Sequence, residues 1–205
     1  MRRILYTTAS LAALALSTTT ARAAAVQADM SFAGAFPVGV YETGDRAEDV
    51  FDAGVGVLGD VLWGINDNLM VGAGVGVYRN GGGYFDYGFG TGGEHIVYHL
   101  TSVPVHGLVL WREGQPEGFG YYAEGGLGFT HHSFSVEHFD ELDGSQTSFS
   151  YLLGAGVSFP LNRRWDLTGG LAFNQAITTS DSDVWYEGDN PKSLLLTIGF
   201  RWHQE

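Results

Sequence analysis

The chain is 205 residues long, which suits a single domain, and it has no cysteine, which excludes disulfides and thiolate metal sites. Charged residues make up only 16 % of it, against about 25 % in a typical soluble domain, while 31 residues are glycine. The formal net charge of −13 excludes a nucleic acid as partner, because no basic surface offsets the acids.

The first 23 residues are predicted to be a secretory signal peptide. They begin with the positively charged "MRR", continue with a mostly apolar stretch at 4–16 and end with "ARA", which matches a small-residue cleavage site. Cleavage after Ala25 fits as well. A retained membrane anchor is the alternative, although the apolar run is short for a bilayer span. The mature domain, 24–205, would keep seven basic and 23 acidic residues, a net charge of −16, and we expect it to be exported.

Eight segments of alternating apolar and small residues follow, each bounded by a cluster of Gly, Asp, Asn, Pro or Ser. Most reach the length of about 9–11 residues that a tilted transmembrane strand needs, whereas strands of soluble proteins usually have about 5–6. No helix is predicted. The segments lie near 30–41, 50–63, 68–79, 96–111, 118–134, 147–159, 164–177 and 192–203.

Several of these segments pair one apolar face with one nearly empty face. In "VGAGVGV" (71–77) the valines and the alanine share one side of a strand, because side chains alternate with period two, and three glycines occupy the other. The pattern recurs at 53–59, 124–129 and 152–159. We expect lipid to contact the apolar face and the glycines to line a lumen, where they leave room for a few large side chains.

The connections between the segments alternate in length. Short ones are predicted at 64–67, 112–117 and 160–163, and longer ones at 42–49, 80–95, 135–146 and 178–191. Short periplasmic turns and long extracellular loops are typical of outer-membrane barrels. The predicted fold is therefore all-β, an eight-stranded antiparallel up-and-down transmembrane β-barrel. A soluble barrel with its apolar face inward is the alternative, but it would carry Lys and Glu along the other face, where these strands have very few charges.

Aromatic residues cluster at both ends of the predicted strands, in the apolar phase. Two such girdles mark the two membrane–water interfaces of a barrel. Beside the short turns and the C-terminus lie Trp63, Trp111, Tyr121, Trp165 and Trp202, joined by Phe119 and Phe159. Toward the other end lie Phe51, Phe129, Tyr151 and Phe173.

The chain resembles the outer-membrane β-barrel domain family, which comprises small porin-like proteins related to eight-stranded OmpA/OmpX-type barrels. The matching stretches are "FAGAFPVGVY", "GINDNLMVGAGVGVY", "TSVPVHGLVLW", "GYYAEGGLGF", "YLLGAGVSFPLNRRWDLTGGLAF" and "LLLTIGFRW". The resemblance implies the outer membrane of a Gram-negative envelope as location. The last stretch resembles the C-terminal signal that the barrel-assembly machinery binds, although three residues follow its final aromatic, Trp202.

A polar cluster is predicted on the lumen face. Its members are Asp60, His106, Glu124, Asp166 and Arg201. Because an unpaired buried charge is costly, Arg201 is expected to pair with one or more of these acids. The cluster is interpreted as a structural plug, and a polar gate or ion path is the alternative.

The end of the fifth segment, "HHSFSVEH", offers a possible catalytic site. Some small outer-membrane barrels are lipid A deacylases with a His-x-Ser pair near the membrane surface, which His131 and Ser133 resemble, and Glu137 is a candidate to orient the histidine. The spacing fits no compact metal-ligand motif. A polar strand end is the simpler interpretation, and we expect no catalytic residue, metal or cofactor.

The acids gather in the long connections, where divalent cations are candidates to bridge them to lipopolysaccharide phosphates. Aromatic side chains in the same connections suggest a contact surface. The leading hypothesis is a non-enzymatic outer-membrane barrel with a filled lumen and a structural or surface-interaction role. A narrow porin-like channel for small or apolar solutes is second, and a lipid A-modifying enzyme is third. The expected partners are outer-membrane lipid, lipopolysaccharide, the assembly machinery and an unidentified extracellular partner.

Overall fold

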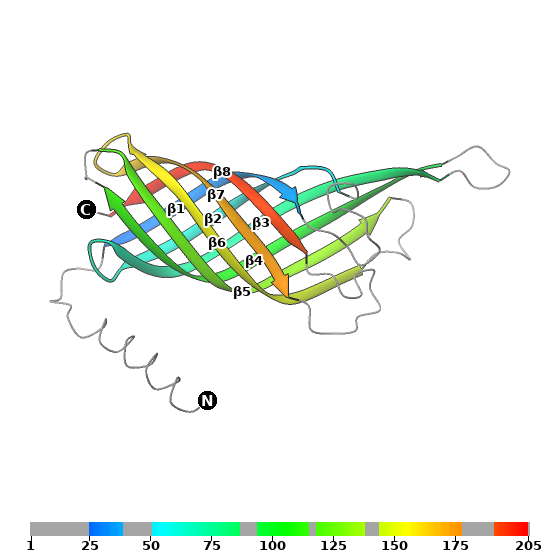
Figure 1. Cartoon of the computed structure of the whole chain (residues 1–205), viewed down its shortest axis with the longest axis horizontal. Coiled ribbons are helices and arrows are strands. Elements are labelled where there is room, and N and C mark those ends of the chain that lie inside the picture. The colour runs from blue at the N-terminus through cyan, green and yellow to red at the C-terminus, as the bar shows by residue number, and fades with distance from the viewer. Residues whose placement is uncertain are drawn as a thin grey trace, which may run out of the picture.

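The computed structural model describes residues 25–38, 51–86, 94–114, 118–137, 144–177 and 191–204 as a closed barrel of eight antiparallel strands in sequence order (Figure 1). The predicted signal peptide lies outside these residues. Nowhere in the described ranges does a helix reach the length and hydropathy needed to span a membrane. The strands are β1 (Val26–Pro37), β2 (Gly54–Gly64), β3 (Leu69–Asp86), β4 (Glu94–Gly114), β5 (Gly120–Val136), β6 (Gly144–Pro160), β7 (Trp165–Ile177) and β8 (Lys192–His203).

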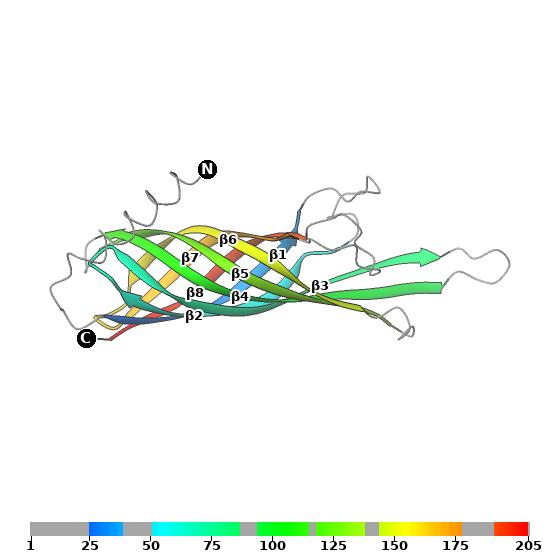
Figure 2. The ribbon, with the colours of Figure 1, turned by 90° about the horizontal axis from the view of Figure 1, so that it is seen from below.

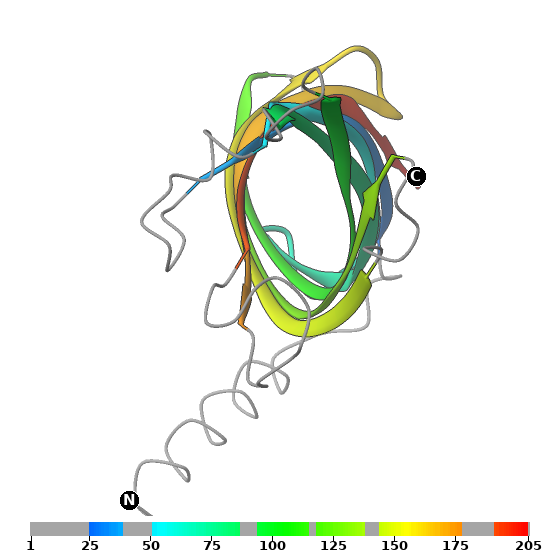
Figure 3. The same cartoon turned by 90° about the vertical axis from the view of Figure 1, so that its right-hand side faces the viewer.

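The ring closes because β1 pairs with both β2 and β8. Met30, for example, lies opposite Gly59 on one side and Phe200 on the other. Seen end on, the strands form a slightly flattened ring (Figure 3). Every strand edge within the ring is paired, so the predicted all-β, up-and-down barrel is confirmed.

The hairpin of β3 and β4 extends well beyond the rest of the barrel (Figure 2). Its ladder continues to the pair Asp86–Glu94, so most of the connection predicted at 80–95 is strand, and that prediction is wrong. The glycines at 81–83 were interpreted as a turn signal. Backbone hydrogen bonds between strands need no side chains, however, so glycines can continue a ladder that its partner strand supports.

The first strand begins four residues earlier than predicted, at Val26 instead of residue 30, and ends at Pro37. The ladder with β8 starts at the pair Gln27–His203 and thus includes Asp29, one residue before the predicted start of the strand. The remaining boundaries differ from the prediction by a few residues, and the last strand matches it.

The outside of the barrel is apolar. Within the described ranges, 25 large hydrophobic side chains are exposed, among them Phe32, Val55, Leu127, Phe129 and Ile198, each more than half accessible. An apolar surface of this extent is characteristic of contact with a membrane. The apolar phase therefore faces outward, as predicted, and a soluble barrel with an apolar interior is excluded.

The glycine face points inward and makes room for larger lumen side chains. A Cβ at Gly74 would collide with the carboxylate of Asp60, its partner on β2. A Cβ at Gly154 would lie 2.5 Å from Oε1 of Glu124, its partner on β5. Each of these two glycines thus leaves room for the acidic side chain of the residue opposite it.

Aromatic side chains form a band at the end of the barrel with the short turns and the C-terminus, hereafter the turn end. Trp63, Trp111, Tyr121 and Trp165 are each 40–46 % exposed, and the rings of Trp111 and Tyr121 are 5.9 Å apart. Trp202 is half-buried beside Trp165, its partner on β7.

The opposite end, hereafter the loop end, carries outward aromatics at Phe129, Phe149, Tyr151 and Phe173. Phe51 is not among them, and its assignment to this girdle is wrong. It is 2 % exposed, precedes β2, and packs edge-on against Tyr98, with ring centroids 5.4 Å apart. Because Phe51 lies before the first residue of β2, the alternation of inward and outward side chains along that strand does not apply to it.

Candidate functional site in the barrel interior

An ion pair inside the barrel joins the first strand to the last. Arg201 of β8 lies directly opposite Asp29 of β1 in the register that closes the ring. Its Nε donates to both carboxylate oxygens at 3.0 Å, and its Nη2 lies 2.9 Å from Oδ2. Arg201 is 2 % exposed. Charge-assisted hydrogen bonds of this kind are among the strongest in proteins, so the closing seam has a strong side-chain contact as well as its backbone ladder.

Tyr122 of β5 supports the same guanidinium. The Cζ of Arg201 lies 4.7 Å from the centroid of the tyrosine ring, in cation–π contact. The ring lies across the lumen against β6 and β7, where Gly156 and Gly170 leave space for its phenol group. The ion pair is therefore held against the opposite wall of the barrel.

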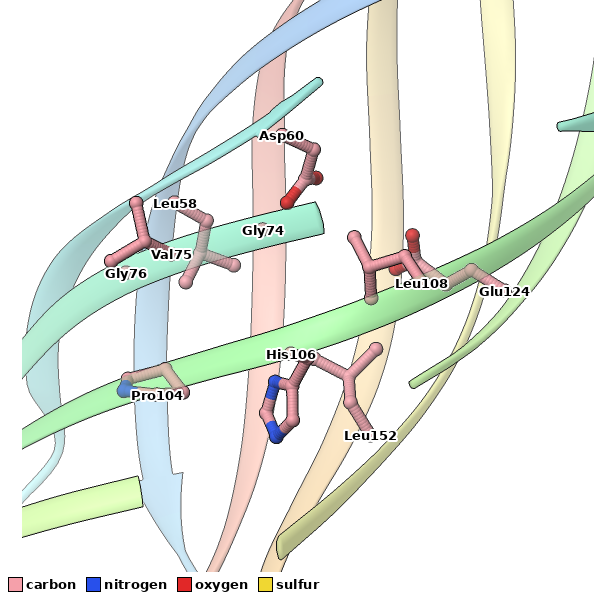
Figure 4. A pocket seen from close by; sticks show the side chains of 10 residues that line it. All are labelled: Leu58, Asp60, Gly74, Val75, Gly76, Pro104, His106, Leu108, Glu124 and Leu152. Carbon is pink, nitrogen blue, oxygen red and sulfur yellow. The ribbon is translucent and has the colours of Figure 1, made fainter. Parts of the chain in front are cut away.

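Asp60, His106 and Glu124 surround a small cavity in the middle of the barrel (Figure 4). Its volume is about 30 Å³, and leucines, glycines, a valine and a proline complete its walls. A space of this size holds about one or two water molecules and no larger solute. The structure thus brings these three predicted residues together around a potential water site.

The carboxyl groups near the cavity interact with Arg201 at longer range. Asp60 lies directly opposite Asp29 in the β1–β2 register. Arg201 attracts the carboxylates of both Asp60 and Glu124, while its hydrogen bonds go to Asp29. This one guanidinium thus interacts with acidic side chains from three other strands, β1, β2 and β5.

On the side of the cavity that faces the loop end, His106 begins a network of hydrogen bonds between neutral groups. Its Nε2 lies 2.9 Å from Oγ of Ser150, which accepts a hydrogen bond from Oγ1 of Thr130 at 2.9 Å. Asn174 donates to Oη of Tyr78 at 3.0 Å and to Thr130 at 3.4 Å. The network crosses the lumen between β3, β4, β5, β6 and β7 and fills it with bonded side chains.

Toward the loop end, the interior contains an apolar cluster next to buried polar side chains such as Ser102 and His132. Phe51, Tyr98, Leu100, Phe134 and Val136 form one buried cluster. The ring of Phe134 packs against Phe51 at 6.4 Å and against Tyr98 at 5.8 Å. The cluster thus fills the part of the interior next to β4 and β5 with apolar side chains.

The turn end is open by comparison. A polar cavity of about 650 Å³ lies there, lined among others by Gln27, Arg112, Asp166 and His203. Asp166 is one of the acids predicted as possible partners of Arg201, its neighbour on β8, but its side-chain contact is with Nε2 of His203, 2.9 Å from Oδ2. Asp166 thus belongs to the rim of the barrel, whereas Arg201 belongs to the interior.

Asp29 is the interior residue that sequence reasoning missed. The alternation of Gln27, Asp29 and Ser31 continues the lumen phase of β1 and was the available signal. The predicted strand began one residue too late to include Asp29, so Arg201 was assigned to other acids.

His131 and Ser133 do not form a catalytic triad with Glu137. His131 is exposed on the outer wall, and its Nδ1 lies 2.9 Å from Oγ1 of Thr147. Glu137 contacts His99 instead, at 3.4 Å.

The interior holds a different pair, in which Oγ of Ser102 lies 2.9 Å from Nδ1 of buried His132, whose Nε2 has no partner among the described residues. Within the described ranges, no three His, Cys, Asp or Glu side chains are grouped to hold a metal ion.

Comparison with known proteins gives matches at the level of structure. No family model matches the sequence, and neither does any curated protein. Neisserial surface protein A is similar with a TM-score of 0.56 and 19 % identity, over 87 % of this chain and 96 % of that one.

Two further solved structures are similar over comparable lengths. The outer membrane protein OprG from Pseudomonas aeruginosa has a TM-score of 0.54 and 14 % identity, over 90 % of this chain and 97 % of that one. Ail, the attachment invasion locus protein of Yersinia pestis, was solved with the heparin analogue sucrose octasulfate. It has a TM-score of 0.51 and 15 % identity, over 88 % of this chain and 99 % of that one. These likenesses concern the fold.

Proposed function

We propose that this chain, which has the fold of the eight-stranded outer-membrane β-barrels, lies in the outer membrane and acts through its loop end, with a lumen closed to solutes. The packing of the interior carries the proposal. Only about 30 Å³ is empty around Asp60, His106 and Glu124, and an apolar cluster follows toward the loop end. The long β3–β4 hairpin, which projects past the barrel, supports a role in surface contact (Figure 1).

Charge favours a cationic partner at this end. The four long connections predicted from the sequence carry 14 of the 23 acidic residues. A surface of this charge repels polyanions and attracts basic partners or divalent cations. A ligand like the sulfated sugar bound to Ail is therefore not expected here.

Single-channel recording of the refolded mature protein in a planar lipid bilayer is expected to give no discrete conductance steps. The physical reason is that bonded side chains and the apolar cluster occupy the lumen. Reproducible steps that change in the variant Arg201→Ala would contradict the closed lumen. They would favour the second candidate, a narrow channel, for which the open cavity at the turn end is the supporting feature.

Surface labelling is expected to place the long connections outside the cell. Because the chain has no cysteine, a single introduced cysteine supplies the only thiol that can be labelled. Ser182→Cys, in the connection predicted at 178–191, should react with a membrane-impermeant maleimide on intact cells. Arg163→Cys, in the exposed short turn between β6 and β7, should react only after the outer membrane is permeabilised. The reverse pattern would invert the proposed orientation.

The lipid A-modifying hypothesis has less support. Its two residues, His131 and Ser133, face outward, and the carboxylate proposed to orient the histidine contacts His99 instead. A serine nucleophile needs both a base and a group that orients it.

A further inference from the structure

The outer wall changes from apolar to polar directly beyond the aromatic pair Phe129–Phe149, whose rings lie 6.0 Å apart. Two residues further toward the loop end, His131 and Thr147 occupy the same outward phase of β5 and β6. Three more outward positions on β3, β4 and β5 are polar as well. We call this set the outer polar patch: Arg79, Thr101, His131, Ser133 and Thr147.

The patch is continuous across four strands. Arg79 lies opposite Thr101, which lies opposite Ser133, and His131 lies opposite Thr147. Side chains directly opposite each other have Cβ atoms about 4.5–5.5 Å apart, so these groups are neighbours. All of them are exposed except Thr101, which is half-buried.

The patch carries a positive charge that no carboxylate in the described part of the chain pairs with. No ion pair joins Arg79 to a carboxylate of the described residues, and its side chain is exposed. The acid nearest along β5, Glu137, is held by His99. The hydrogen bond to Thr147 fixes the imidazole of His131 and leaves its Nε2 as the remaining ring nitrogen. An exposed guanidinium next to the hydroxyl groups of the patch, on Thr101, Ser133 and Thr147, suits an anion.

We propose that the outer polar patch binds a phosphate of the lipopolysaccharide headgroup, with Arg79 as the main contact. This inference rests on the proposed location in the outer membrane. Aromatic girdles mark the membrane–water interface, so groups just beyond Phe129 and Phe149 lie at the level of lipid headgroups. A guanidinium matches the geometry of a phosphate with two parallel hydrogen bonds, and neighbouring hydroxyls donate to the remaining oxygens.

Native mass spectrometry of the mature protein in detergent micelles, with bisphosphorylated lipid A as the probe, tests the patch. Arg79→Gln should weaken lipid A binding by about tenfold or more, as expected for loss of a charge-assisted contact. Lys192→Gln removes the same charge at the same end of the barrel, on β8, and should bind as the unaltered protein does. Lipid A without its phosphates should bind the unaltered protein as weakly as intact lipid A binds Arg79→Gln.

Three outcomes would overturn the inference: unchanged binding in Arg79→Gln, equal weakening in Lys192→Gln, and displacement of the lipid by inorganic phosphate. The last would identify free phosphate as the ligand. Gel mobility of unheated samples verifies that each variant is folded. The proposed location in the outer membrane is tested separately, by cell fractionation. A protein that is not found in the outer-membrane fraction would contradict the location, whatever its affinity for lipid A.

Discussion

Replacing Arg201 with alanine is expected to cost the barrel about 3–5 kcal/mol of folding free energy, since removal of one partner leaves a buried charge unpaired. The guanidinium makes the hydrogen bonds to Asp29 and contacts the ring of Tyr122. It also lies close enough to the carboxyl groups of Asp60 and Glu124 to interact with them, so its loss removes the cation that faces all three acidic side chains in the lumen.

Urea unfolding in detergent micelles, followed by the gel mobility of unheated samples, measures this cost. The double variant Asp29→Leu/Arg201→Met is the control, because replacing both members of a buried pair by apolar residues is often neutral or stabilising. It should be clearly more stable than Arg201→Ala. A single variant that costs less than about 1 kcal/mol, the value typical of exposed ion pairs, would show that the pair does not stabilise the closing seam.

The second large effect is expected at Gly156, on the lumen face of β6. A Cβ there would lie 2.5 Å from Cζ and Oη of Tyr122 and from the carbonyl oxygen of Gly169. Gly156→Ala should therefore cost about 1–3 kcal/mol through overpacking and displacement of the ring that supports Arg201.

Gly169→Ala is the matched control in the same strand pair. Gly169 faces outward, and a Cβ there would meet only the carbonyl oxygen of Thr197, at an ordinary 3.8 Å. Its urea midpoint should stay close to that of the unaltered protein. If the two alanine variants unfold at the same urea concentration, the lumen glycines are not required for space, and the explanation of the glycine face fails.

The fold could be predicted because each strand carries its own signal. Alternation with period two is a local property, and a lipid-facing strand must keep one face apolar along its whole length. "VGAGVGV" within β3 and "LLLTIGFRW" within β8 show this directly. The lengths of the segments and the order of short and long connections then indicated a membrane barrel of eight strands.

Strand ends were predicted less well, since they depend on the partner strand. The glycines at 81–83 carry no signal for a strand, yet β4 continues the ladder past them. Phe51 has the right residue type for a girdle, but it packs inside against Tyr98 and Phe134 because β2 begins only at Gly54.

By itself, the sequence determined which side chains face the lipid and which face the lumen, because the strand period assigns each residue to a face. It placed Asp60, His106, Glu124 and Arg201 inside for that reason. Only the tertiary structure decided which of them meet. Arg201 finds Asp29 across 172 residues, since ring closure brings the last strand beside the first in one register. That register results from all eight strand pairings together, and no local pattern in the chain specifies it.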